Sequence, residues 1–416
     1  MKPGYHILFA LSDTGHGHRS AATAIKAAML QLSRDPLTCT TLDILRSSAL
    51  PLLQQAPTLY QQLLLRCPFC YNTLFRWSNQ RWLMQPYAWL SVAMAHRQLV
   101  QLFASLRPDL VVVTHPLVNR LVSQLRRQYR LSYRIVTVVT DLVTLHTSWL
   151  DPDVDLYLVP TLEAAWIAQQ HGIPPAQIIY TGFPVHPDFV QQQQTQHEAR
   201  RTLGLQQDRF TLLITGGGAG CGQMSDLVAA VHARFPTQQL LVVTGHNQPL
   251  YHRLMSRYRS SLIHIFGFVT NMHLLMTASD AVITKAGPGT LMEAMTLGRP
   301  LIMTEAVGMQ EEGNINWVLD HEYGMFCPSL GHVLQAVVQL QKRSGAPRTT
   351  DNGPRILMQQ GTYRIAAVIL QQLADTKPMI DRISFSSVLF HDKTASSILS
   401  YQHDMVSMLL QLKARS

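Results

Sequence analysis

The sequence predicts an α/β fold of two Rossmann-like domains, each built on a parallel sheet, that face each other across a cleft. Short apolar runs alternate with helical stretches along the chain, which is the pattern of parallel sheets. A strand that leads into a glycine-rich turn occurs twice, at residues 7–17 and again at 211–218. Residues 182–195 lie between these two openings and contain prolines and a glutamine run, a composition that is typical of a linker. A repeated opening on either side of a linker indicates two similar halves.

Strands are expected where an apolar run is bounded by turn residues. In the first half these runs are 7–11, 40–45, 110–114, 135–140 and 156–160, and in the second half they are 211–215, 240–244, 263–266, 281–284 and 301–304. Helices are expected over 20–31 and over most of 52–103.

The composition is that of an ordinary globular protein. The 416 residues favour two or three domains, and 47% of them are hydrophobic, which is enough for normal cores. No run of about 18 uncharged apolar residues occurs, so no membrane-spanning helix is expected. The first residues lack the pattern of a signal peptide, and five unevenly spaced cysteines indicate a reducing compartment. We therefore expect a cytoplasmic protein.

Positive charge is concentrated in the first third of the chain. The net charge is +9, and residues 1–140 hold 15 Lys and Arg against 4 Asp and Glu. No acidic residue occurs between Asp43 and Asp109, a stretch that also contains many leucines and several tryptophans. Arginines that meet anionic head groups, beside indoles and leucines that enter the acyl boundary, favour contact with a membrane. Nucleic acid is the rival partner, although no nucleic-acid-binding motif occurs, and a helical insertion with a plain core face is the third interpretation.

The most informative stretch is 281–317, where an apolar run leads into the glycine turn Gly287-Pro288-Gly289-Thr290. A helix should follow from Leu291, with Glu293 in its first turn. Backbone N–H groups and the positive end of the helix then point at one spot, which suits an anion such as phosphate. The next strand leads to three polar side chains that suit the hydroxyl groups of a phosphorylated sugar: Gln310, Glu311 and Asn314.

A second glycine turn, residues 12–20 (SDTGHGHRS), lies between the first strand and an alanine-rich helix. Gly15 and Gly17 permit a tight turn and a close approach of the backbone to a ligand. An imidazole at such a place is suited to general base catalysis. His18 is the candidate base, His16 is the alternative, and a structural histidine at a helix start is the remaining interpretation.

These motifs resemble those of the monogalactosyldiacylglycerol synthase family, in order and in spacing, over roughly residues 5–330. The matching stretches are 12–20, Thr140-Asp141-Leu142, Gly267-Phe268 and 281–317. Members of that family are glycosyltransferases of the two-Rossmann-domain (GT-B) type that use nucleotide sugars. The sequence departs from the family at His16, where a glycine is usual.

The resemblance implies a role for each motif residue. His18 takes the place of the catalytic base, and Asp141 would orient that base or bind the acceptor, unless it is a turn aspartate. Glu293 would bind the ribose, Phe268 would contact the nucleobase or fill the core, and no metal ion is implied. The other implied donor contacts are Gly17, Gly217, Gly218, Gly287, Gly289, Thr290, Gln310, Glu311 and Asn314.

The resemblance also implies what each part of the chain does. An acceptor-binding, membrane-facing domain would cover 1–183, with a helical insertion near 52–103. A nucleotide-sugar-binding domain would cover 196–362, and a helix and tail over 363–416 would return toward the first domain.

We accordingly predict a hexosyltransferase that moves galactose or glucose from UDP-galactose or UDP-glucose to the free hydroxyl group of diacylglycerol, with inversion. The product would be a monoglycosyldiacylglycerol, and no cofactor is required. The expected partners are the UDP-sugar, diacylglycerol and anionic membrane lipids, with no nucleic acid, on the inner face of the cell membrane. The alternatives are another lipid-linked acceptor and a non-catalytic protein that binds nucleotide sugars.

Overall fold

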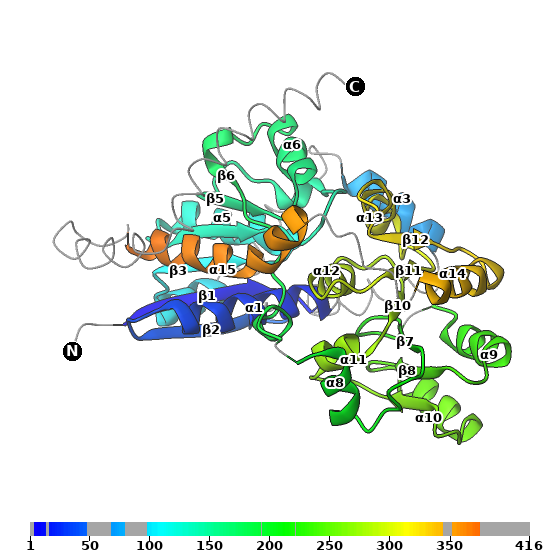
Figure 1. Ribbon diagram of the computed structural model, residues 1–416. Helices are drawn as coiled ribbons and strands as arrows, with labels where there is room; N and C mark the ends of the chain where they lie inside the picture. Colours follow the sequence, from blue (N-terminus) through cyan, green and yellow to red (C-terminus); the bar gives the residue numbers. More distant parts are fainter. Residues whose placement is uncertain are drawn as a thin grey trace.

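The computed structural model describes residues 4–13, 16–47, 68–79, 98–192, 194–220, 222–343 and 352–374. Over these residues the chain forms two six-stranded parallel sheets, one in each half (Figure 1). The strand order is β2-β1-β3-β4-β5-β6 in the first sheet and β12-β11-β10-β7-β8-β9 in the second. The predicted α/β fold with two parallel-sheet domains is confirmed.

The first sheet is built from apolar strands that are buried on both faces. Its strands are β1 (Tyr5–Leu11), β2 (Leu37–Asp43), β3 (Leu110–Val113), β4 (Arg134–Val138), β5 (Leu156–Val159) and β6 (Ile178–Tyr180). Strand β3 reads Leu-Val-Val-Val and is buried at every position, as expected of a central strand in a parallel sheet. The sequence analysis missed β6, a strand of three residues at the edge of the sheet.

Side chains that alternate along the strands of this sheet build a separate core on each face. Leu8 and Ala10 of β1 pack in a core that includes α5 (Pro116–Tyr129) and α6 (Leu162–Gln170). Ile7 and Phe9 pack in a second core that includes α1 (His16–Leu32) and α15 (Asn352–Ala374). Because the side-chain period of a strand is two, helices can cover both faces of one sheet.

The second sheet repeats this arrangement. Its strands are β7 (Thr211–Thr215), β8 (Gln239–Val243), β9 (Ile263–Phe266), β10 (Ala281–Thr284), β11 (Leu301–Met303) and β12 (Gly324–Phe326). The helices that follow them are α9 (Met224–Arg234), α10 (Gln248–Arg257), α11 (Met272–Ala278), α12 (Pro288–Thr296), α13 (Met309–Asp320) and α14 (Leu330–Arg343). Leu212 of β7 packs on the face covered by α9 and α14, and Leu213 packs on the face covered by α11 and α12. Strand β12, which begins with a glycine, was not predicted.

The stretch 182–195, expected to be a linker, is packed against the second domain. It contains the short helix α7 (Pro187–Val190), and Phe183, Val185 and Phe189 are buried in the core around β7 and β10. These apolar residues alternate with prolines in the sequence. The composition therefore resembles a linker although the segment packs into a core. Helix α8 (Gln196–Thr202) then begins at Thr195 with a capping box that includes Glu198.

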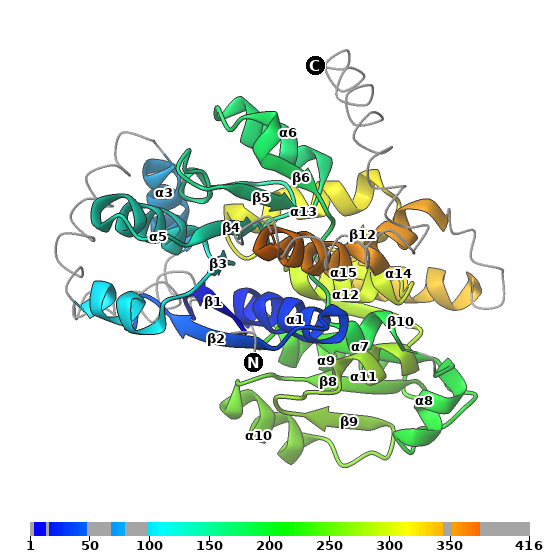
Figure 2. The same ribbon diagram turned by 90° about the vertical axis from the view of Figure 1, so that its left-hand side faces the viewer.

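Helix α15 returns from the second domain to the first, where it lies against α1 (Figures 1 and 2). Ile365 and Ile369 are buried there, and Arg134 of β4 donates a hydrogen bond to the Gln372 side chain at 2.8 Å. Gly361 lets the helix cross the chain at Phe183, because a Cβ at Gly361 would lie 2.7 Å from the Phe183 carbonyl oxygen. The chain therefore crosses between the domains at two adjacent places.

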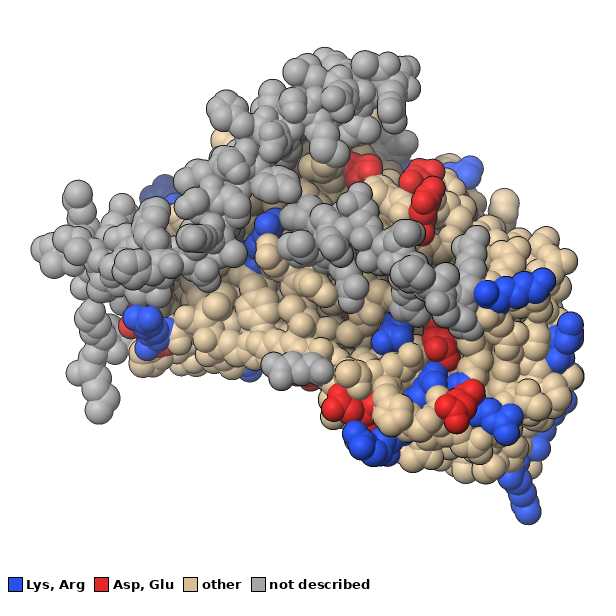
Figure 3. Space-filling model, in the orientation of Figure 1, with Lys and Arg blue, Asp and Glu red and all other residues tan. Residues whose placement is uncertain are grey.

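Two helical stretches represent the predicted insertion near 52–103. They are α3 (Pro68–Ser78) and residues 98–106, while 52–67 and 80–97 lie outside the described residues, as does the tail from 375 onward. Within the described part of the chain, no helix combines the length and the apolar character needed to cross a membrane. On the face shown in Figure 3, charged side chains of both signs gather over the second domain.

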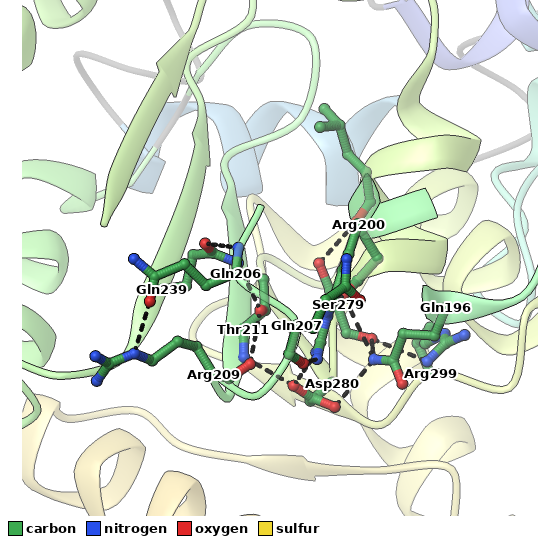
Figure 4. Close-up of polar contacts among 12 residues, drawn as sticks. Gln196, Arg200, Gln206, Gln207, Arg209, Thr211, Gln239, Ser279, Asp280 and Arg299 are labelled. Carbon is green, nitrogen blue, oxygen red and sulfur yellow. Dashed lines mark hydrogen bonds and ion pairs between the residues drawn. The ribbon is translucent and has the colours of Figure 1, made fainter. Parts of the chain in front are cut away.

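A polar network ties together the amino ends of the strands in the second sheet (Figure 4). Asp280, just before β10, pairs with Arg200 of α8 at 2.6 Å and accepts hydrogen bonds from the Gln196 side chain and the Thr211 N–H group. Arg200 also donates to the Ala278 carbonyl oxygen, and its side chain is only 9% exposed. Protein groups satisfy both charges at this edge, so the network serves the fold.

Asp280→Ala should lower the free energy of unfolding by about 3–5 kcal/mol, because the buried guanidinium of Arg200 would lose its carboxylate. Chemical denaturation followed by circular dichroism measures the loss. Asp208 is exposed, so Asp208→Ala is a matched control that should cost less than about 0.5 kcal/mol. Equal losses in the two variants would show that the network does not support the fold.

Candidate functional site

The candidate site residues lie at the carboxyl ends of strands in both domains. In the first domain, β1 leads to His18 on α1 and β4 leads to Asp141. In the second domain, β10 leads to the glycine turn before α12, and β11 leads to Gln310 on α13. Parallel strands present all their carboxyl ends on one edge, so each domain contributes one set of side chains. The two sets meet, because Gln310 donates a hydrogen bond to Asp141.

His18 lies in the first turn of α1, and Thr140 holds its ring. The His18 Nδ1 is 3.0 Å from the Thr140 Oγ1, and the Thr114 hydroxyl donates to the His18 carbonyl oxygen at 3.1 Å. Burial lowers the pKa of His18 to about 4, although a backbone hydrogen bond with Thr114 opposes this shift. The imidazole is therefore neutral near pH 7 and has a lone pair that can accept a proton. His16, the alternative base, begins the same helix, but its side chain lies outside the described residues.

A second histidine, His115, lies against His18. The two ring centroids are 4.5 Å apart in an edge-to-face arrangement. His115 caps α5, because its Nδ1 accepts a hydrogen bond from the Leu117 N–H group at 3.3 Å. Burial, and next the nearby charge of His18 when protonated, hold the pKa of His115 well below its ordinary value. The pair is consequently neutral near pH 7, and His115 serves both the helix and the wall of the site.

Asp141 joins the two domains. Its Oδ2 accepts a hydrogen bond from the Trp149 Nε1 at 2.6 Å, and its Oδ1 accepts one from the Gln310 Nε2 at 2.6 Å. Burial raises the pKa of Asp141 to about 6, while the hydrogen bonds from Trp149 and Gln310 oppose that shift. The side chain that contacts the His18 Nδ1 is that of Thr140, the residue before Asp141. The arrangement gives Thr140, which the sequence analysis did not single out, the position of a group that orients His18.

Helix α13 approaches the first domain closely at one further point. Its Gly313 faces the loop after Asp141, and a Cβ there would lie 2.5 Å from the Thr144 Oγ1 and 3.3 Å from the Val143 Cβ. Leu142 of the same loop is buried in the core of the second domain. A side chain at Gly313 would therefore push the two domains apart at the candidate site.

The glycine turn of the second domain begins α12 three residues earlier than predicted. Helix α12 begins at Pro288, because the fixed φ of proline suits the first position of a helix. Glu293 consequently lies in the second turn of the helix and not in the first. Gly289 at the start of α12 and Gly17 at the start of α1 face open space, since a Cβ at either would meet nothing within 4 Å. A ligand can therefore approach both helix starts closely.

Glu293 is half-buried on α12. Burial raises its pKa to about 8, and no hydrogen bond or ion pair to it occurs within the described ranges. Thr290 lies three residues earlier, which places it next to Glu293 on the helix surface. A desolvated polar group that lacks a hydrogen bond costs free energy, and ligand hydroxyl groups could supply the missing bonds.

Lys285 is a candidate site residue that the sequence analysis missed. It follows β10 directly, and its ammonium group pairs with the Glu311 carboxylate. A Cβ on Gly217 would lie 3.4 Å from the Lys285 Cε, and a Cβ on Gly287 would lie 3.0 Å from its Nζ. Lys285 thus lies between the glycine turns after β7 and β10. A lysine between a strand and a glycine turn was the available signal in the sequence.

The turn after β7 is packed onto the turn after β8. Gly217 has a φ of +72°, and the Gly218 carbonyl oxygen accepts a hydrogen bond from the His246 N–H group at 2.9 Å. The His246 ring stacks on Phe268, with centroids 4.3 Å apart and 20° between the planes. Phe268 is 54% exposed, so it does not fill the core. Sequence reasoning missed His246, because the stack joins residues from two different turns.

The polar residues of α13 also support the shape of the site. Asn314 donates a hydrogen bond to the Ala286 carbonyl oxygen at 2.9 Å, which braces the glycine turn. Its Oδ1 is buried without a hydrogen-bond partner in the described structure. Glu311 holds Lys285, and Gln310 spans the domains. No cluster of three or more His, Cys, Asp or Glu in the described ranges is placed to hold a metal ion.

The sequence is similar to known proteins over most of its length. The family model described as monogalactosyldiacylglycerol (MGDG) synthase matches residues 18–185, and the glycosyltransferase family 28 C-terminal domain matches 211–306. The chloroplastic monogalactosyldiacylglycerol synthase of Spinacia oleracea is 33% identical, over 80% of this chain and 65% of that protein. A probable chloroplastic monogalactosyldiacylglycerol synthase 2 of Oryza sativa subsp. indica is 30% identical, over 77% and 70%. The chain spans about 65% of the length of the first of these relatives.

Solved structures of low sequence identity share the architecture. The UDP-GlcNAc 2-epimerase of Methanocaldococcus jannaschii, in complex with UDP-GlcNAc and UDP, has a TM-score of 0.57 at 12% identity, over 89% of this chain and 99% of that one. The UDP-GlcNAc 2-epimerase of Neisseria meningitidis has a TM-score of 0.52 at 14% identity, over 89% and 100%. These likenesses show the GT-B fold alone. The sequence relatives go further, and together with the order of motifs along both sheets they show that the chain belongs to the monogalactosyldiacylglycerol synthase family.

Proposed function

We propose that this chain is a hexosyltransferase that moves galactose or glucose from a UDP-sugar to the free hydroxyl group of diacylglycerol, with inversion at the anomeric carbon. One observation carries the proposal: the interdomain hydrogen bond between Asp141 and Gln310 joins the residue next to Thr140, which holds the neutral His18, to the residue next to Glu311, which pairs with Lys285. Family membership supports the acceptor and the sugar, since the relatives are named for monogalactosyldiacylglycerol.

The donor binds the second domain. Its diphosphate lies at the start of α12, where the N–H groups of the turn, the positive helix end and the Lys285 ammonium act together. Glu293 receives the ribose hydroxyl groups, which gives its buried carboxyl group hydrogen-bond partners. The stacked pair of His246 and Phe268 offers its exposed ring to the uracil. Gln310 and the rest of α13 border the hexose.

The reaction is a single displacement. His18 takes the proton of the diacylglycerol hydroxyl group at Nε2 while the hydroxyl oxygen forms a bond to the anomeric carbon. The bond from that carbon to the phosphate oxygen breaks, and UDP leaves with the electron pair. Attack from the face opposite to UDP inverts the carbon. Lys285 and the start of α12 stabilise the negative charge on UDP, a role for which no cofactor is required.

The donor also tunes the base. A pKa of about 4 makes His18 a weak base in the free protein. The negative diphosphate favours the protonated imidazole and so raises the pKa of His18 toward neutrality when the donor is bound. Thr140 engages Nδ1, so the ring offers Nε2 to the acceptor. The base therefore gains strength at the moment when the sugar is in place.

The acceptor arrives from a membrane along the first domain. The excess of Lys and Arg in residues 1–140 and the exposed Phe69, Leu74 and Trp77 of α3 support this route. We place the protein peripherally on the inner face of the cell membrane, with anionic lipids among its partners.

Incubation with UDP-galactose or UDP-glucose and vesicles that contain diacylglycerol tests the proposal. Mass spectrometry should detect a monohexosyl diacylglycerol, and NMR of its anomeric proton should show a configuration opposite to that of the donor. A product formed only on another lipid-linked acceptor would replace diacylglycerol in the proposal. UDP binding without any product would leave a non-catalytic nucleotide-sugar-binding protein.

His18→Ala should lower turnover about 10²–10⁴-fold with little change in UDP affinity, because the base is lost and the donor contacts remain. Near-normal turnover in His18→Ala together with its loss in His16→Ala would move the base to His16.

Thr140→Val should lower kcat without raising the KM for the UDP-sugar, and Thr140→Ser, which keeps the hydroxyl group, should restore kcat. Steady-state kinetics with both substrates gives these values.

Lys285→Met should weaken UDP binding about 10-fold to 150-fold, the range for a lost hydrogen bond between charged groups. Uridine, which lacks phosphate, should bind the variant as it binds the original protein. Isothermal titration with the two ligands separates the effects. An equal loss for both would mean that Lys285 only supports the turns around it.

Glu293→Gln should change how stability depends on pH. The folded protein holds the proton of Glu293 up to a pKa of about 8, so this group destabilises the fold increasingly as pH rises from its ordinary pKa to about 8. Glutamine does not titrate, so the variant should gain stability relative to the original protein from pH 5 to pH 8, by at most about 1.4 kcal/mol per pH unit. Urea denaturation at several pH values measures this. Parallel pH profiles would contradict the buried state of the carboxyl group.

A further inference from the structure

Helix α3 of the first domain contacts both domains. At its C-terminal end, the Ser78 Oγ lies 3.1 Å from the His146 Nε2, and the Phe75 ring packs edge-on against His146 at 4.9 Å. Farther along the helix, the Asn72 Oδ1 accepts a hydrogen bond from the Met309 N–H group at 3.1 Å. Met309 is the first residue of α13, and Figure 1 shows α3 beside α13.

Asn72 supplies a helix cap from another domain. The first N–H groups of a helix have no partner within the helix, and asparagine is among the residues that best satisfy them. The residue at the N-cap position of α13 is Gly308, which has no side chain to do so. Asn72 therefore holds the start of the helix that carries Gln310 and Glu311.

The outer face of α3 is apolar and exposed. Phe69 is 80% exposed, Trp77 is 68% exposed and Leu74 is 57% exposed. At 100° per residue, Leu74 and Trp77 project from a different side of the helix than Asn72, whereas Phe69 lies three residues before Asn72 and borders its side. The helix can consequently contact a second surface with this face while Asn72 keeps its hydrogen bond.

A lipid surface is the partner that this face fits. Two aromatic side chains and a leucine are the residues that enter the boundary between head groups and acyl chains. Arg76 borders the face, where its Nε donates to the Met309 Sδ of α13 at 3.1 Å, and the sequence around it has no acid from residue 44 to residue 108. The face therefore lacks the negative charge that anionic head groups would repel, and it offers the positive charge that they attract.

We propose that the apolar face of α3 docks on a lipid surface, and that docking strengthens nucleotide binding in the second domain through the Asn72 cap on α13. The inference rests on the proposed function, since it assumes that the second domain binds UDP. Docking holds α3 where Asn72 meets Met309. The cap holds the start of α13, and with it Glu311, which pairs with Lys285 between the glycine turns.

The expected coupling free energy follows from the free energy that the Asn72 cap contributes. Loss of an asparagine cap costs about 1 kcal/mol, which corresponds to about a fivefold change in an equilibrium constant. Vesicles should therefore tighten UDP binding up to about fivefold. Linkage is reciprocal, so UDP should strengthen vesicle binding by the same factor.

Isothermal titration with UDP, with and without phosphatidylcholine vesicles that contain phosphatidylglycerol and no diacylglycerol, tests the coupling on the full chain. Asn72→Ala should bind vesicles normally and lose the vesicle effect on UDP. Asn72→Asp keeps the acceptor oxygen and should keep the effect. Thr73→Ala is the matched control, because the exposed Thr73 hydroxyl group donates to the Phe69 carbonyl oxygen of its own helix and, among the described residues, makes no hydrogen bond to α13.

The same measurements can overturn the inference. UDP affinity that stays unchanged or falls on vesicles that the protein does bind would contradict the coupling, as would an Asn72→Ala variant that keeps the full effect. Phe69→Ser combined with Trp77→Ser should abolish vesicle co-sedimentation, and its persistence would rule out α3 as the docking face. If the unmodified protein binds no UDP under either condition, the proposed function itself fails, so the two failures are distinguishable.

Discussion

The hydrogen bond between Asp141 and Gln310 is the interaction on which the candidate site depends. It joins the carboxyl edges of two sheets that are otherwise separate layers, and it forms at the point where Gly313 admits the loop after Asp141. Burial works against the carboxylate, as its raised pKa shows, and the hydrogen bonds from Trp149 and Gln310 offset that cost. The contact joins the loop beside Thr140, which holds His18, to the helix that carries Glu311, the partner of Lys285.

The amino edge and the carboxyl edge of the second sheet have different roles. At the amino edge, Asp280 and Arg200 satisfy each other and the neighbouring backbone groups, so this edge stabilises the fold. At the carboxyl edge, the Asn314 Oδ1 is buried without a partner in the described residues, and the half-buried Glu293 has a pKa that burial raises to about 8. A buried polar group without a hydrogen bond lowers the stability of the fold, and the rest of the structure must offset that loss. The position of these two residues agrees with ligand binding at the carboxyl ends of parallel strands.

Burial also sets the charge of the candidate site before any ligand arrives. His18 and His115 are neutral near pH 7, the Glu293 carboxyl group is largely protonated, and the charge of Lys285 is balanced by Glu311. An anionic diphosphate would therefore enter a site in which Asp141, with a pKa of about 6, is an uncompensated charge. It could attract the Lys285 ammonium and raise the proton affinity of His18 at the same time. One charge on the ligand would thus act on both domains.

The sequence by itself determined the strands, the glycine turns and the family, because the periods of apolar residues and the backbone freedom of glycine are local properties. His18 and Glu293 could be singled out because they stand beside those turns. Strands β6 and β12 were not predicted; both are short strands at the edge of a sheet, whereas β11, equally short, lies inside its sheet and within a longer apolar run. The tertiary structure decided that Thr140 holds His18, that Lys285 lies between two turns, and that His246 stacks on Phe268. Each of these contacts joins residues that are distant in the chain, and its geometry follows from how two twisted sheets and their helices pack, which no local pattern encodes.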